Sequence, residues 1–141
     1  MGDDTLLTNE QLAAIDLPTL IIAATDDRTT PVDPNVEVAW AESNASPHFR
    51  LELVDAEHQT FTDLCDYVAA IPDNPNATQV LVDTVTELAE EGCAPDDLPI
   101  ERAKEITNTF AVTFLESVFR EGEMFTTDSH ELPDDIIYDN K

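Results

Sequence analysis

Positively charged side chains are scarce in this 141-residue chain, which has 6 lysines and arginines against 31 aspartates and glutamates, a formal net charge of −25. A surface this acidic repels phosphate backbones and anionic lipids, so we expect no nucleic-acid or membrane-surface partner. No run approaches the ~20 apolar residues of a transmembrane helix, and no basic-then-apolar leader is recognised. Two cysteines are too few for a four-cysteine zinc site, and the three histidines lack metal-ligand spacing, so we expect no metal.

The acidic residues are spread along the chain rather than gathered in one tail. Residues 1–58 carry 12 of them, residues 59–120 another 12, and residues 121–141 the last 7. An even distribution favours a halophilic protein, in which concentrated salt screens the repulsion, over a polyanionic mimic, whose charge is usually concentrated on one face. Apolar residues make up 42% of the chain, which is enough for the core of one domain.

The hydrophobic pattern of the first half predicts a strand, a helix and a second strand. Residues 19–24 form a continuous apolar run, typical of a strand buried on both faces of a parallel sheet. A helix is expected to begin near Pro34. Residues 49–54 alternate apolar and charged side chains, which predicts a second strand with one wetter face, near a sheet edge. Before this unit, Thr8 and Gln11 have the spacing of a helix capping box.

The second half predicts three helices, over residues 60–69, 78–91 and 100–121. Gly92 is expected to end the middle helix as its C′ residue. The last helix has the most regular apolar spacing, and its phenylalanines are expected to face the core.

The strand–helix–strand unit places two candidate catalytic residues at one edge of the sheet. A crossover of this kind makes the strands parallel, so the loops over residues 25–31 and 55–59 share the carboxyl edge, where open α/β sheets place their ligands. One loop carries Asp27 and the other His58. A carboxylate bonded to one imidazole nitrogen fixes the tautomer and stabilises the imidazolium, as a general-base histidine requires. Asp26 is the alternative acid, because a one-residue shift of the strand end exchanges the two aspartates.

Both candidates have ordinary structural readings as well. Asp27 could cap its own turn, as most loop aspartates do, and His58 could bond only to nearby backbone. The buried strand before Asp27, and Phe61 as an expected anchor for the histidine loop, favour the catalytic interpretation. His48 is expected to be an ordinary surface residue.

The residues around these candidates resemble a known family. Asp27-Arg28-Thr29-Thr30-Pro31 after an apolar strand resembles the acid loop of α/β-hydrolases. The run His58-Gln59-Thr60-Phe61-Thr62-Asp63-Leu64-Cys65 resembles the histidine loop of esterases like dienelactone hydrolase and platelet-activating-factor acetylhydrolase. Residues 92–95 and 109–115 are similar to the closing helix region of that group, so the resemblance covers about residues 17–120.

The resemblance implies the carboxyl-terminal part of an α/β-hydrolase fold: two parallel strands with a crossover helix, followed by helices. It implies a serine hydrolase acting on small-molecule carboxylic esters, in which an upstream serine attacks, His58 moves the proton and Asp27 orients His58. No metal or organic cofactor is implied. The expected division is an approach segment (1–16), a partial hydrolase domain (17–122) and a loose acidic tail (123–141), pinned by Ile136, Ile137 and Tyr138.

The sequence departs from the family's pattern in three ways. Ala24 and Glu57 stand where the family tends to have glycine. No Gly-x-Ser-x-Gly elbow is present, and both cysteines follow His58, in the wrong order for a replacement nucleophile. The chain is therefore expected to be inactive alone and to self-associate through an exposed sheet edge. The alternative function is a non-catalytic acidic interaction module that retains the hydrolase topology.

The two cysteines leave two alternatives open. Cys65 and Cys93 are either a disulfide or two separate thiols, as in a reducing compartment. The family resemblance favours the bond, which would in turn favour an exported parent protein.

Overall fold

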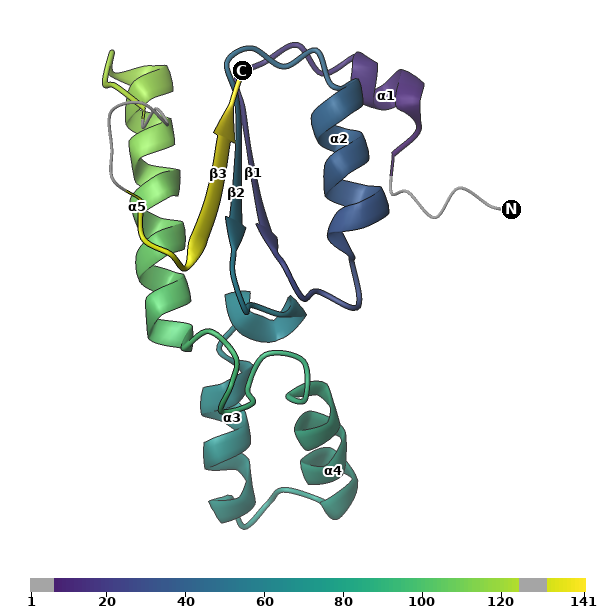
Figure 1. Cartoon of the computed structure of the whole chain (residues 1–141). Coiled ribbons are helices and arrows are strands. Elements are labelled where there is room, and N and C mark those ends of the chain that lie inside the picture. The colour runs from purple at the N-terminus through teal and green to yellow at the C-terminus, as the bar shows by residue number, and fades with distance from the viewer. Residues whose placement is uncertain (1–6, 125–131) are drawn as a thin grey trace.

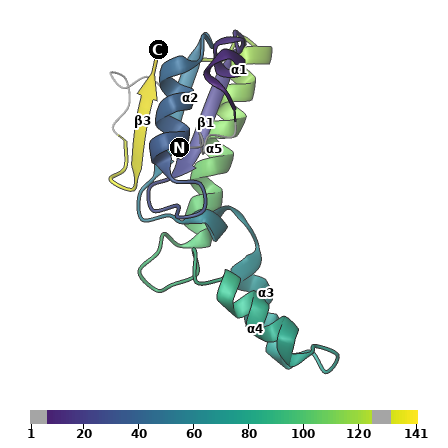
Figure 2. The same ribbon diagram turned by 90° about the vertical axis from the view of Figure 1, so that its right-hand side faces the viewer.

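A three-stranded mixed sheet lies between two helical layers in the computed structural model, which describes residues 7–124 and 132–141. Helix α5 covers one face of the sheet, and α1 and α2 cover the other (Figures 1 and 2). The strands are β1 (Thr19–Ala24), β2 (His48–Leu53) and β3 (Ile136–Asn140). The helices are α1 (Asn9–Ala13), α2 (Glu37–Glu42), α3 (Leu64–Ala70), α4 (Gln79–Leu88) and α5 (Ile100–Phe119), with short helical turns η1 (Val32–Val36), η2 (His58–Phe61) and η3 (Ile71–Asp73).

Strands β1 and β2 are parallel, which confirms the predicted strand–helix–strand unit. Their register runs from Thr19 opposite His48 to Ala24 opposite Leu53. Both strands therefore end on the same side of the sheet (Figure 1). The predicted capping box before α1 is also present, since the Thr8 hydroxyl accepts from the Gln11 backbone N–H and the Gln11 side chain accepts from the Thr8 N–H.

The sheet face under α5 carries the hydrophobic core. Alternate residues of β2, namely Phe49, Leu51 and Leu53, are buried there, because successive side chains of a strand point to opposite faces. They pack against the apolar side of α5, which includes Ile106 and Phe110. The expectation that all phenylalanines of α5 face the core is wrong at its end, because Phe119 is 77% exposed.

The sheet face under α2 is buried as well, although its β2 side chains are polar. His48, Arg50 and Glu52 are all buried there. Arg50 bonds to Glu52 on the same strand and to Glu37 of α2, the latter at 2.7 Å. The predictions of a wetter face near a sheet edge and of an exposed His48 are therefore wrong: β2 is the central strand, and α2 covers its charged residues.

The end of the chain joins the sheet rather than forming a loose tail. Strand β3 pairs antiparallel with β2, from Phe49 opposite Asn140 to Leu53 opposite Ile136. Ile136 and Tyr138 are buried, as the suggested pinning requires, whereas Ile137 faces solvent. The expected tail is thus corrected for its last part, and residues 125–131, like residues 1–6 of the approach segment, lie outside the described ranges.

Helices α3 and α4 form a hairpin that extends away from the carboxyl edge of the sheet (Figures 1 and 2). A disulfide between Cys65 and Cys93 joins the two ends of this hairpin, so of the two alternatives the bonded one is found. Helix α4 is capped by Thr78, as its predicted start requires, but it ends at Leu88, with Ala89 as C-cap, and Gly92 lies in the following loop. The predicted helix over 60–69 is split into η2 and α3. None of the helices in the described ranges is long and apolar enough to cross a membrane.

Candidate active site

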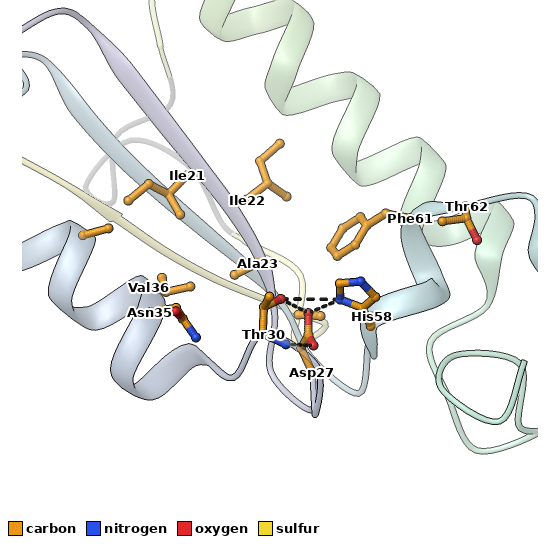
Figure 3. A pocket seen from close by; sticks show the side chains of 12 residues that line it. Ile21, Ile22, Ala23, Asp27, Thr30, Asn35, Val36, His58, Phe61 and Thr62 are labelled. Atoms are coloured by element: carbon orange, nitrogen blue, oxygen red, sulfur yellow. Dashed lines mark hydrogen bonds and ion pairs between the residues drawn. The ribbon is translucent and has the colours of Figure 1, made fainter. Parts of the chain in front are cut away.

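The carboxyl edge of the sheet brings Asp27 and His58 into direct contact. Asp27 lies in the loop after β1, and His58 begins η2 in the segment after β2. The Asp27 Oδ2 and His58 Nδ1 atoms are 2.9 Å apart (Figure 3). The predicted juxtaposition is therefore confirmed, and for Asp27 rather than Asp26, which is exposed.

The two oxygens of the Asp27 carboxylate are held by the following turn. Oδ1 accepts hydrogen bonds from the backbone N–H groups of Thr29 at 2.9 Å and Thr30 at 2.6 Å. Oδ2 accepts a bond from the Thr30 hydroxyl at 2.7 Å. Burial alone would raise the pKa of Asp27, but these bonds from Thr30 and the interaction with His58 hold it below its usual value. The carboxylate is thus ionised and fixed in orientation at neutral pH.

The ionised carboxylate determines which nitrogen of His58 carries the proton. A carboxylate accepts hydrogen bonds only, so the Nδ1 atom facing Asp27 must be the donor. The Thr30 hydroxyl, which also lies near Nδ1, already donates its proton to Asp27, so it cannot donate to Nδ1. In the neutral imidazole the Nε2 atom is then the unprotonated nitrogen, able to accept a proton from a third group. This is the arrangement of a general base oriented by a carboxylate.

An open pocket of about 470 Å³ lies beside the imidazole. His58 and Asp27 form its polar end, and Ile22, Phe61 and Val36 contribute apolar walls (Figure 3). The His58 side chain is 36% exposed and that of Asp27 only 8%, so the imidazole is accessible while the carboxylate behind it is shielded.

Thr60, rather than the expected Phe61, anchors the histidine loop. Phe61 is exposed on the pocket wall, whereas Thr60 is completely buried. The Thr60 hydroxyl accepts from the Glu57 N–H at 2.9 Å, and the Thr60 N–H donates to the Glu57 carbonyl at 3.1 Å. Gly92 packs on the same backbone, where a Cβ atom would lie 2.7 Å from the Thr60 nitrogen. Glycine at this position, with a φ of +124°, lets the loop after α4 approach His58 closely.

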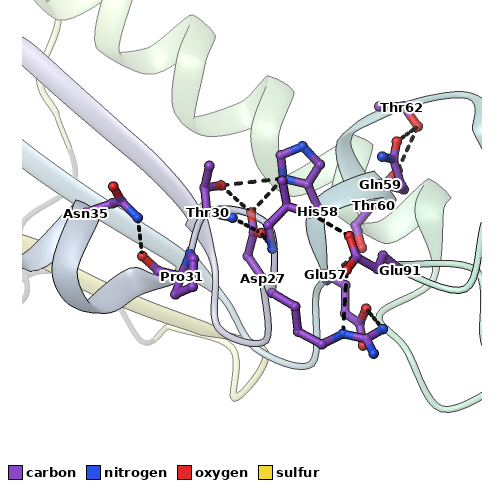
Figure 4. Close-up of polar contacts among 12 residues, drawn as sticks. Asp27, Thr30, Pro31, Asn35, Glu57, His58, Gln59, Thr60, Thr62 and Glu91 are labelled. Atoms are coloured by element: carbon purple, nitrogen blue, oxygen red, sulfur yellow. Dashed lines mark hydrogen bonds and ion pairs between the residues drawn. The ribbon is translucent and has the colours of Figure 1, made fainter. Parts of the chain in front are cut away.

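Sequence reasoning did not assign a role to Thr30, which bonds both oxygens of Asp27. An aspartate followed three residues later by threonine is a turn signal, and it could have identified this side chain. Nor did the sequence assign a direction to the side chain of Glu57, which stands where the resembled family tends to have glycine. Its Oε2 atom lies 2.7 Å from the Arg28 guanidinium, on the side of the loop that faces the acid loop (Figure 4).

The described residues contain no group of three or more histidine, cysteine or acidic side chains placed to hold a metal ion. Comparisons with models of protein families, with curated proteins and with solved structures give no match to the chain.

Proposed function

We propose that this chain is the carboxyl-terminal portion of an α/β-hydrolase-type serine esterase, in which Asp27 and His58 are the acid and the base of the triad. A serine supplied by polypeptide outside these 141 residues attacks the carbonyl of a small-molecule ester. His58 Nε2 takes the serine proton and later donates it to the leaving alkoxide, while Asp27 stabilises the imidazolium.

The observation that carries this proposal is the 2.9 Å contact between Asp27 Oδ2 and His58 Nδ1. The Thr29 and Thr30 bonds hold the carboxylate in place, and the pocket gives the opposite side of the imidazole access to a reacting group. Two parallel strands deliver both loops to one edge, which is where α/β folds build their sites.

The edge of β1 is compatible with a larger sheet. Within the described ranges β1 pairs with β2 and with no other strand, so the N–H and C=O groups of alternate β1 residues point away from the sheet. The strand carries no charged residue or proline, the devices that usually protect a free edge. A further strand on this edge would extend the sheet next to His58.

The test restores the in-frame upstream coding sequence and measures hydrolysis of a short-chain nitrophenyl ester. We expect His58→Ala and Asp27→Asn each to lower kcat by about 10²–10⁴-fold, as loss of a positioned acid or base does. Arg120→Gln, a change on the far end of α5, is the control and should leave turnover unchanged. Turnover that survives His58→Ala would refute the proposal.

A second candidate is a non-catalytic acidic interaction module. The net charge of −25 and the lack of a Gly-x-Ser-x-Gly elbow favour it. The upstream coding sequence separates the two functions: an in-frame elbow supports the esterase, and unrelated sequence supports the module.

A further inference from the structure

We propose that Arg28 and Glu57 are positioning residues, whose ion pair ties the loop of Asp27 to the loop of His58 and so keeps the imidazole aligned with its carboxylate. The inference rests on the proposed function, because it assigns a role to residues around the same pair. It concerns two residues that touch neither the pocket nor the reacting nitrogen.

The ion pair runs alongside the Asp27–His58 contact. Arg28 directly follows Asp27, and Glu57 directly precedes His58. The Arg28 Nη2 atom lies 2.7 Å from Glu57 Oε2, slightly closer than the 2.9 Å contact between Asp27 and His58. The loops are already joined where they leave the sheet, because the Asp26 N–H donates to the Ala56 carbonyl at 3.0 Å and the Asp55 N–H donates to the Thr25 hydroxyl at 3.1 Å. The ion pair adds a side-chain link between the residues directly adjacent to Asp27 and His58, so it restrains the part of each loop that sets the direction of the two side chains.

A third segment, residues 90–91 after α4, forms hydrogen bonds with both loops. The Arg28 guanidinium also donates to the Glu90 carbonyl at 3.2 Å, and the neighbouring Thr29 hydroxyl donates to the Glu91 carboxylate at 2.7 Å. On the other side, the Gln59 N–H donates to the Glu91 carbonyl at 2.8 Å (Figure 4). Because the Cys65–Cys93 disulfide holds the end of this segment, Arg28 connects the acid loop to a covalently fixed support.

Arg28 also binds the carboxylate of Glu57, which could otherwise compete with Asp27 for the hydrogen bond from His58. Glu57 is adjacent to His58 in the chain, and an unpaired carboxylate there could accept a bond from the imidazole. In the structure its side chain bonds Arg28. The hydrogen bond to Glu57 raises the pKa of Arg28, so the guanidinium remains charged whenever the site is functional.

The experiment reads the tautomer of His58 from its two ring ¹⁵N shifts, in this chain at pH 8, with the resonances assigned by His58→Gln. We expect the ratio of Nδ1–H to Nε2–H tautomer to fall about two- to fivefold in Arg28→Gln and in Glu57→Gln, which is the range that an exposed ion pair can transmit. Arg28→Lys keeps the charge and should retain the ratio. Arg28 is 60% exposed, and Glu57→Gln preserves the shape of a side chain that is 16% exposed, so these variants should fold, and circular dichroism checks this.

Arg102→Gln is the matched control. It also removes one arginine that links two segments, through bonds to Asp135 at 2.6 and 3.0 Å, but its side chain bonds to neither loop. It should change the stability and leave the tautomer ratio unchanged, which separates positioning from general structural support.

Asp27→Asn distinguishes the failure of this inference from failure of the proposed function. If Asp27→Asn leaves the ratio unchanged, Asp27 does not hold His58, and both ideas are overturned. If Asp27→Asn lowers the ratio while Arg28→Gln and Glu57→Gln do not, only the positioning role is overturned. A fall in all three variants, with Arg28→Lys and Arg102→Gln unchanged, supports it.

Discussion

Both faces of strand β2 are buried, but by different chemistry. Toward α5, the strand presents Leu51 and Leu53, both with no exposed surface, and their burial is driven by removal of hydrocarbon from water. Toward α2, it presents Arg50 and Glu52, which are buried only because each charge has a partner. The comparison teaches that an alternating apolar and charged pattern does not require one face of a strand to be wet.

Removal of hydrocarbon from the α5 face should have the largest effect. Leu51→Ala leaves a cavity at the centre of the core cluster, so we expect the free energy of unfolding to fall by about 2–5 kcal/mol. Urea unfolding followed by circular dichroism measures this loss. A loss below about 1 kcal/mol would mean that this face is less tightly packed than its contacts indicate.

Removing one partner of the Arg50–Glu52 ion pair on the α2 face should lower the free energy of unfolding by nearly as much. Arg50→Met leaves the buried Glu52 carboxylate without its cation, and we expect a loss of about 3 kcal/mol at pH 7. The double variant with Arg50→Met and Glu52→Leu removes both charges, and its stability should return to within about 1 kcal/mol of the wild type. If the double variant is no more stable than the single one, the cost comes from packing rather than from an unpaired charge.

His48 lies on the same α2 face of β2, but it is not paired as Arg50 and Glu52 are. Among the described residues, neither nitrogen of its buried imidazole has a hydrogen-bond partner. Its effect on stability is expected to be smaller. Burial, and secondarily the charge of Lys141, lowers the pKa of His48. The unfolded chain, with an ordinary histidine pKa of about 6.5, therefore takes up a proton that the folded chain does not. Stability contributed by the neutral ring is complete above that pH and decreases as the pH falls below it.

We expect the wild type to lose up to about 1 kcal/mol between about pH 6.5 and 5.5, and His48→Phe to lose less over the same interval. Unfolding at a series of pH values measures the difference. Asp27 does not interfere, because its lowered pKa affects stability only below about pH 3.9. Equal pH slopes for the two proteins would contradict the assignment to His48.

The strands of the parallel unit and the meeting of Asp27 with His58 could be predicted because their signals are local. The apolar run over 19–24 and the alternation over 49–54 each specify a strand, and one crossover makes the strands parallel. The carboxyl ends of parallel strands lie together, so the proximity of the two loops follows without any knowledge of side-chain packing.

Features that depend on distant partners could not be predicted in this way. Strand β3 pairs with β2 across about 85 residues of chain, so no short hairpin loop between the two strands indicates the pairing. The burial of His48 depends on Trp40, whose ring centroid lies 4.4 Å from the imidazole. The direction of Glu57 depends on Arg28, which lies 29 residues earlier.

The disulfide between Cys65 and Cys93 has a consequence for how this chain tolerates change. The disulfide holds the two ends of the α3–α4 hairpin together, so the loop over residues 74–77, at its far tip, should tolerate an insertion, a deletion or a fused reporter. Substitutions at that tip would leave Glu91 in place beside the histidine loop. The length of the hairpin can therefore vary during evolution without displacing the residues beside His58.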